Sequence, residues 1–109
     1  MKRWEIREVQ LPSKVKLFVV VSPQSVIDGS DHHQGLVNAL VCNSLRPVHQ
    51  KKSYDVVLDQ SDGLETATVV PCNFLYGLPR GMFGAVRGEV TPARREAITS
   101  TIAAVLRGR

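Results

Sequence analysis

Short runs of β-branched and apolar residues, separated by polar segments, constrain the fold of this chain more than any other feature. The clearest run, KVKLFVVVS at residues 14–22, is continuously apolar in its middle and predicts a central strand of a sheet. Ahead of it, RWEIREVQ at residues 3–10 alternates apolar and polar side chains, which predicts an edge strand. Further strands are predicted at residues 36–42, 54–59, 65–78 with a kink at Pro71, and 85–90.

One long helix is predicted, at the end of the chain. Thr91 is a suitable N-cap, Pro92 suits the first helical position, and Gly108 suits the position just beyond the helix. Between them, apolar residues recur at helical spacing: Ala97, Ile98, Ile102 and Val105. The remaining segments are polar and predict loops at 23–35, with room for one helical turn at 24–27, and at 43–53, and a turn at 61–63. The pattern predicts a mainly β fold with a C-terminal helix, in which a small, strongly curved antiparallel barrel or sheet carries the helix.

Length and charge limit the classes of partner. The 109 residues fit a single domain, residues 1–109, and 43% hydrophobic residues allow a modest core that a partner subunit would help to stabilise. The net charge of +4 favours an anionic partner, either a nucleic acid or an acidic polypeptide.

The two cysteines, Cys42 and Cys72, lie 30 residues apart without a CxxC pair, so their spacing predicts buried reduced thiols and no metal site. No cofactor is expected either. The chain opens without the apolar segment of a signal peptide and has no run of about 20 apolar residues. These features predict a cytoplasmic protein that does not cross a membrane.

Three stretches of the sequence carry a resemblance to a known family. They are KLFVVVSPQSVID, then LVNALVCNS followed by SYDVVLD and DGL, and finally TVVPCNFLYGLPRGMFGAVRGEVTPARREAITSTIAAVL. In this order and spacing, over about residues 14–106, the chain resembles the PemK/MazF and CcdB superfamily of toxins from bacterial toxin–antitoxin modules. The resemblance implies an SH3-like small barrel with a terminal helix, a homodimer, and neutralisation by an antitoxin whose acidic disordered tail wraps the toxin.

The two branches of this superfamily imply different activities. In the PemK/MazF branch, a metal-independent endoribonuclease cleaves single-stranded RNA by attack of a 2′-hydroxyl on the adjacent phosphate. Such chemistry needs a cation near the phosphate and a proton acceptor near the sugar. In the CcdB branch, the toxin inhibits DNA gyrase without catalysis. A third possibility is a catalytically inactive relative that only binds its antitoxin.

The residues that carry the family chemistry are substituted here. Lys16 stands where PemK/MazF proteins have an arginine that contributes to the site. Pro71, Cys72 and Asn73 stand where that branch has an Arg-Cys-Asp strand end, and an asparagine cannot act as a base near neutral pH. The CcdB activity transfers no better, because this chain lacks the Trp-Gly-Ile terminus that contacts gyrase.

Other candidate site residues lie mostly in the polar loops, and each also has a structural explanation that needs no function. His32 and His33, beside Asp31, could transfer protons or simply be exposed. A basic cluster around His49 could grip phosphates or be a solvated loop, and Arg80 and Arg87 could face RNA or an acidic antitoxin. Trp4, Phe74 and Tyr76 could stack on bases, but the alternation of Phe74 and Tyr76 favours a core role for one face.

The leading prediction is therefore an endoribonuclease with a substituted site. Lys16 supplies charge, His32 and His33 are candidates for proton transfer, and Asn73 offers a hydrogen bond. The predicted RNA-binding residues share polar or basic side chains: Ser22, Gln24, Asn43, Ser44, Arg46, Lys51 and Arg80.

Overall fold

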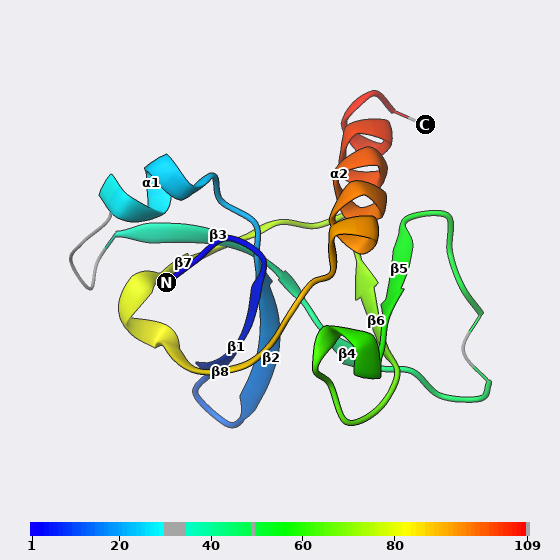
Figure 1. Cartoon of the computed structure of the whole chain (residues 1–109), viewed down its shortest axis with the longest axis horizontal. Coiled ribbons are helices and arrows are strands. Elements are labelled where there is room, and N and C mark those ends of the chain that lie inside the picture. Colours follow the sequence, from blue (N-terminus) through cyan, green and yellow to red (C-terminus); the bar gives the residue numbers. More distant parts are fainter. Residues whose placement is uncertain (30–34, 49, 109) are drawn as a thin grey trace.

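Two antiparallel sheets and a C-terminal helix enclose a shared core in the computed structural model, which describes residues 1–29, 35–48 and 50–108 (Figure 1). The five-stranded sheet has the order β7 (Tyr76–Pro79), β3 (Leu36–Val41), β2 (Val15–Val20), β1 (Glu5–Gln10), β8 (Phe83–Glu89). The three-stranded sheet has the order β4 (Asn43–Ser44), β6 (Thr68–Pro71), β5 (Asp55–Leu58). The helices are α1 (Gln24–Gly29) and α2 (Pro92–Leu106), with 3-10 turns η1 (Gln60–Asp62) and η2 (Arg80–Met82).

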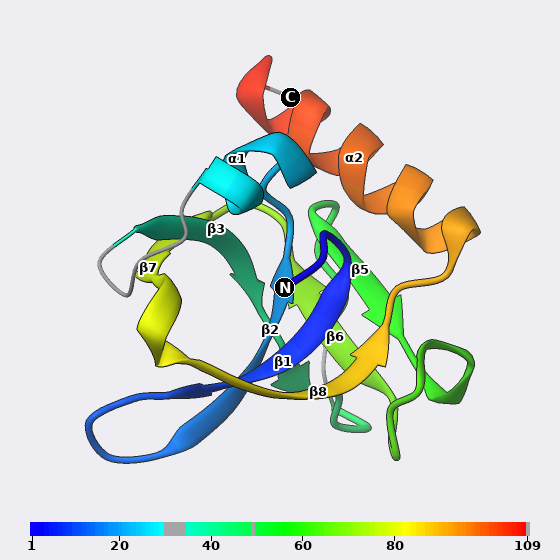
Figure 2. The same cartoon turned by 60° about the vertical axis from the view of Figure 1, so that its left-hand side comes forward.

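The largest core cluster joins both sheets to the last helix. The five-stranded sheet contributes Ile6, Val19 and Leu40, the three-stranded sheet contributes Val70, and α2 contributes Ile98. Figure 2 shows the strong curvature of the larger sheet and places α2 beside the β5–β6 pair. The mainly β fold with a C-terminal helix is thus confirmed, although the strands form two sheets and do not close into one barrel.

The prediction that residues 3–10 form an edge strand is wrong. β1 pairs with β2 on one side and with β8 on the other, so it lies inside the sheet. β8, which overlaps the extended segment predicted at 85–90, supplies the second partner, and its pairing with β1 could not be read from the alternation within residues 3–10. Extra residues in β8 shift the register twice along this pair, and such bulges increase local twist.

Residues 65–78 also differ from the prediction of one kinked strand. The chain leaves the three-stranded sheet after Pro71, turns at Cys72 and Asn73, and enters the other sheet as β7. The Cys72 N–H still donates to the Tyr54 carbonyl at 2.7 Å, and the chain turns directly afterwards, where only a kink was expected. Asn43 and Ser44, assigned to a loop from the sequence, form the short strand β4.

The ends of α2 agree with the sequence. Thr91 is the N-cap, Pro92 is the first helical residue, and Gly108 follows the cap with a φ of 78°. The Thr91 side chain makes no capping hydrogen bond; the Thr91 backbone N–H donates instead to Asp62 Oδ1 at 2.9 Å. The start of the helix is therefore fixed by a residue from the η1 turn.

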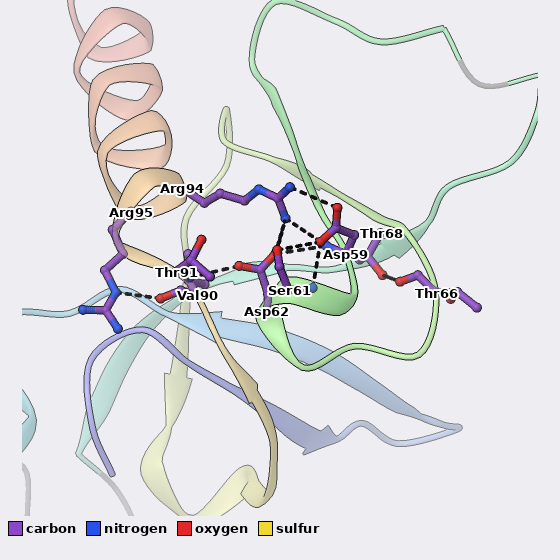
Figure 3. A network of polar contacts seen from close by, with 9 residues as sticks. All are labelled: Asp59, Ser61, Asp62, Thr66, Thr68, Val90, Thr91, Arg94 and Arg95. Carbon is purple, nitrogen blue, oxygen red and sulfur yellow. Dashed lines mark hydrogen bonds and ion pairs between the residues drawn. The ribbon is translucent and has the colours of Figure 1, made fainter.

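Arg94, on the first turn of α2, completes this attachment. Its guanidinium donates to both carboxylate oxygens of Asp59 at 3.0 Å and to Asp62, while Asp59 and Asp62 cap each other across η1 (Figure 3). The guanidinium holds the pKa of Asp59 well below its usual range, and Asp59 in turn raises the pKa of Arg94. This network ties the helix to the segment that follows β5.

Candidate functional site

A pocket of about 400 Å³ lies at the start of β2, and its described lining is mainly cationic and polar. The residues that line it are Lys16, Asn43, Ser44, Arg46 and Val48. Lys16 Nζ donates a hydrogen bond to Asn43 Oδ1 at 2.5 Å. Four residues that were predicted separately to bind or cut RNA, Lys16, Asn43, Ser44 and Arg46, therefore lie around one pocket.

The path of the backbone explains why Lys16 and Asn43 meet. The Cys42 N–H donates to the Leu17 carbonyl at 2.9 Å, which continues the β2–β3 pairing by one step beyond β3. Asn43 then joins β4 and pairs with Val69 of the other sheet. The chain thus passes from one sheet to the other beside Lys16, and this path places the side chain of Asn43 next to the ammonium group.

The electrostatics of the pocket favour an anion. Lys16 is half-buried and bonded to a neutral amide, no carboxylate lies in the described lining of the pocket, and Arg46 adds a second cation. Behind them, burial raises the pKa of the Cys42 thiol to about 12, although the charge of Lys16 acts in the opposite direction. Cys42 therefore stays a neutral thiol and adds no negative charge to the site.

Three other predicted RNA-binding residues lie elsewhere. Ser22 is buried after the far end of β2, and its Oγ accepts the Asn38 N–H at 2.7 Å. Gln24 begins α1 and bonds to the N-terminal segment and to Asp28. Arg80 donates to the Ile27 carbonyl of α1 at 2.7 Å. None of the three lies among the described residues around Lys16.

The remaining predicted site residues lie either away from the described lining of the Lys16 pocket or outside the described residues. Asn73 is exposed in the turn after β6, and Lys51 is exposed in the segment before β5. Neither lines the part of the Lys16 pocket that the structure describes. His32 and His33, like His49, lie outside the described residues, so their roles stay predictions. Cys72 is free and buried, as expected, with the pKa of its thiol raised to about 12 by burial and by nearby Asp55.

The expected core role for one of the two aromatic residues after Pro71 is wrong. Phe74 is 60% exposed and Tyr76 is 36% exposed. Their ring centroids lie 4.7 Å apart, and Tyr76 makes an edge contact with buried Phe18. The turn at Cys72 and Asn73 explains the exposure, because it carries Phe74 out of the three-stranded sheet before β7 begins.

Sequence reasoning missed Val48 as a lining residue of the pocket. A lone valine inside a basic loop offers no periodic signal, so nothing in the sequence could have assigned it.

The structure contains no group of three or more His, Cys, Asp or Glu residues, within the described ranges, that could hold a metal ion. Within those ranges, no helix is both long and apolar enough to cross a membrane.

Comparison with known proteins gives matches in structure alone. No family model matches the chain, and no curated protein matches it in sequence. Among solved structures, an endoribonuclease in complex with its cognate antitoxin from a Mycobacterial species is 24% identical, with a TM-score of 0.80, covering 97% of this chain and 94% of that one. The Mycobacterium tuberculosis toxin MazF-mt6 is 17% identical, with a TM-score of 0.78, covering 94% of this chain and 96% of that one.

A MazE–MazF structure from Deinococcus radiodurans is 16% identical, with a TM-score of 0.76, and covers 97% of this chain and 94% of its own. The likenesses extend over nearly the whole length of each chain. They confirm the resemblance inferred from the sequence at the level of the fold: this chain folds as the MazF-type toxins do.

Proposed function

We propose that this chain is the toxin of a type II toxin–antitoxin module and that it cleaves single-stranded RNA without a metal. The observation that carries the proposal is the Lys16–Asn43 pair, which holds an ammonium group at 2.5 Å from a neutral amide, in a pocket whose described lining has two cations and no carboxylate. The proposal is supported by the fold shared with a mycobacterial endoribonuclease and with MazF toxins.

In the proposed reaction, the 2′-oxygen of one nucleotide bonds to its own 3′-phosphorus while the bond from phosphorus to the 5′-oxygen of the next nucleotide breaks. The proton of the 2′-hydroxyl passes to a base, and an acid gives a proton to the departing 5′-oxygen. Negative charge grows on the non-bridging phosphate oxygens in the transition state. Lys16 Nζ and the Arg46 guanidinium would stabilise that charge, since fixed cations act strongly where water is partly excluded.

The proton transfers need groups other than those around Lys16. The described lining residues offer an amide, a hydroxyl and two cations, but no carboxylate or imidazole. His32 and His33 remain the proposed acid and base, with Asn73 as a hydrogen-bonding group. Asn43 would serve as the positioning residue that sets the direction of the Lys16 side chain.

An acidic antitoxin and a second copy of the chain complete the proposal. A basic surface attracts an acidic disordered tail, and the net charge of +4 suits such a partner.

For the homodimer, the support is an apolar groove of about 270 Å³ between α2 and the larger sheet, lined in part by Trp4, Leu75, Ile102 and Leu106. Leu106 is 78% exposed. A Leu106→Arg variant should shift the sedimentation coefficient from dimer to monomer, and wild-type monomers at micromolar concentration would contradict the dimer.

The decisive experiment is cleavage of a long single-stranded RNA by the purified protein in EDTA. The wild type should cut, and Lys16→Ala should lower the cleavage rate by about 100-fold or more, the usual loss when one group that stabilises transition-state charge is removed. Lys16→Arg should retain part of the rate, because it keeps the positive charge.

Lys14→Ala is the matched control. Lys14 is exposed two residues earlier and lies outside the described lining of the pocket, so its removal changes the net charge by the same amount. If Lys14→Ala and Lys16→Ala lower the cleavage rate equally, the loss comes from the net charge and not from the position of Lys16. Absence of cleavage by the wild type at any concentration would overturn the proposed activity.

A further inference from the structure

A second pocket, of about 490 Å³, opens at the end of the core between the two sheets. The side chains that matter in it are Leu17 of β2, Val86 and Arg87 of β8, Glu65, Thr66 and Thr68. With Leu64, the pocket thus combines three apolar side chains, one carboxylate, one guanidinium and two hydroxyl groups. Nothing in the proposed cleavage reaction uses these groups.

Backbone contacts hold the outer wall of this pocket in place. An added Cβ at Gly88 would collide with the Asp62 carbonyl oxygen, and one at Gly63 would lie 3.0 Å from Gly88 Cα. The η1 turn therefore rests directly on β8, and Gly63, with a φ of 86°, turns the chain into residues 64–66. Thr68 Oγ1 donates to the Thr66 carbonyl at 3.2 Å, and the Arg94 network anchors the turn from above (Figure 3).

The register shift in β8 accounts for the position of Arg87. Ile6 pairs with Gly88, but Arg7 pairs with Val86, so Arg87 has no partner of its own across the ladder. Its Nε donates to Glu8 Oε2 at 2.6 Å, and the side chains of this pair are 58% and 29% exposed. Such an exposed ion pair stabilises the folded chain little, so the guanidinium can move to a phosphate at small cost.

The second pocket adjoins the Lys16 pocket. Across the small sheet, Thr68 of the second pocket pairs with Ser44 of the Lys16 pocket, and paired residues in an antiparallel ladder have Cα atoms about 5 Å apart. A single strand with its phosphate at Lys16 would therefore reach the second pocket by crossing the Ser44–Thr68 pair.

The chemistry of the lining suits a nucleobase. Single-stranded RNA is usually recognised through unstacked bases, whose flat faces contact apolar or planar groups and whose edges form hydrogen bonds. Leu17 and Val86 offer apolar contact. The Glu65 carboxylate only accepts hydrogen bonds, so it favours a base edge with an exocyclic amino group over the carbonyl edge of uracil.

We propose that this pocket binds the base next to the cleaved phosphodiester and prefers bases with an exocyclic amino group, among them adenine and cytosine, to uracil, with Glu65 as the discriminating residue. The inference rests on the proposed ribonuclease function, whose site it extends. Arg87 contributes to affinity through the backbone phosphate and carries no base preference.

Binding of fully 2′-O-methylated hexanucleotides tests the inference, because they lack the attacking hydroxyl and cannot be cut. Fluorescence anisotropy should show that the wild type binds hexa-adenylate and hexacytidylate about tenfold more tightly than hexauridylate. Glu65→Lys should abolish or invert that ratio, since an ammonium group only donates. Arg87→Ala should weaken binding of all three oligonucleotides by a similar factor.

Glu96→Lys is the matched control for charge, because Glu96 is exposed on α2 and the substitution changes the net charge equally. It should tighten binding of every oligonucleotide while leaving the ratio unchanged. Equal wild-type affinities for the three oligonucleotides would overturn the inference even if the wild type cuts RNA. So would an affinity ratio that is unchanged in Glu65→Lys, provided that the melting temperature of this variant is also unchanged. A clear ratio that Glu65→Lys abolishes, in a protein that does not cut RNA, would support the base pocket and overturn the proposed cleavage.

Discussion

Lys16 and Arg94 are held by different kinds of partner. Lys16 donates to the neutral amide of Asn43, and no carboxylate lies in the described lining of its pocket. Arg94 donates to two carboxylates, those of Asp59 and Asp62, which more than cancel its charge. A phosphate would find net positive charge at Lys16 and net negative charge at Arg94.

The difference separates a binding site from a structural attachment. At Arg94, every acceptor comes from the chain, and the result is a fixed junction between η1 and α2 (Figure 3). At Lys16, one amide orients the ammonium group and leaves its charge available to an external anion. Substitutions at Arg94 should therefore act on stability, and substitutions at Lys16 on RNA.

The largest expected effect is the loss of stability in Asp62→Ala. Asp62 is buried and accepts hydrogen bonds from the Thr91 N–H at 2.9 Å, the Asp59 N–H at 3.0 Å and Arg94. Its removal leaves these donors without an acceptor, and we expect the free energy of unfolding to fall by about 3 kcal/mol. Urea unfolding measures this. Glu96→Ala, exposed on α2, should change it by less than about 0.5 kcal/mol.

A smaller loss of about 2 kcal/mol is expected for Gly88→Ala, because the new methyl group must push the η1 turn away from β8. Gly84→Ala on the same strand is the control, since its Cβ would lie at an ordinary 3.6 Å from the Glu8 carbonyl oxygen. Thermal unfolding of both variants gives the comparison. Equal destabilisation would mean that glycine in β8 matters for strand conformation and not for the close approach of η1.

The parts of the fold that local signals encode were predictable. The caps of α2 at Thr91 and Gly108 and the apolar run of β2 depend on residues close in sequence. The placement of β1 between β2 and β8 could not be predicted, because pairing partners depend on a strand about 80 residues away. The split at Pro71 was missed for a similar reason, since periodicity cannot show that two apolar runs belong to different sheets.

The candidate site was predictable in part. Lys16 was assigned through the family resemblance, and the basic loop supplied Arg46, but only the fold shows that Asn43 meets the ammonium group. The Arg94 network was overlooked, although Asp59 and Asp62 have the three-residue spacing of a capping box, a signal that the sequence does contain. Base pockets such as that of Glu65 require three distant segments and leave no local pattern.

Asn43→Asp converts the partner of Lys16 into the kind of partner that Arg94 has. The new carboxylate would cancel the ammonium charge, and we expect affinity for single-stranded RNA to fall about tenfold, with the free energy of unfolding changed by less than about 1 kcal/mol. Filter binding of a 2′-O-methylated RNA measures the affinity. Asn38→Asp adds the same charge on β3, outside the described lining of the Lys16 pocket. If both variants lose affinity equally, net charge and not the Lys16 pair governs binding.

The smallest expected effect is the pH dependence of stability near pH 4. The Arg94 guanidinium lowers the pKa of Asp59. Burial alone would raise the pKa of Asp62, but hydrogen bonds from the Thr91 and Asp59 N–H groups and from Arg94 outweigh it. Unfolded aspartates titrate near pH 3.9, so below about pH 5 the unfolded chain binds more protons than the folded chain.

The stabilisation from both carboxylates is therefore complete above about pH 4 to 5 and declines as the pH falls towards their lowered folded pKa values. Arg94→Met removes the guanidinium that both carboxylates share, so the decline between pH 5 and pH 3 should become shallower in urea unfolding. Lys16→Met is the matched control and should keep the wild-type slope, because the partner of Lys16 does not titrate in this range. If the stability of Arg94→Met falls with pH as steeply as that of the wild type, carboxylates elsewhere cause the acid sensitivity. The ion pairs of Arg94 would then not explain it.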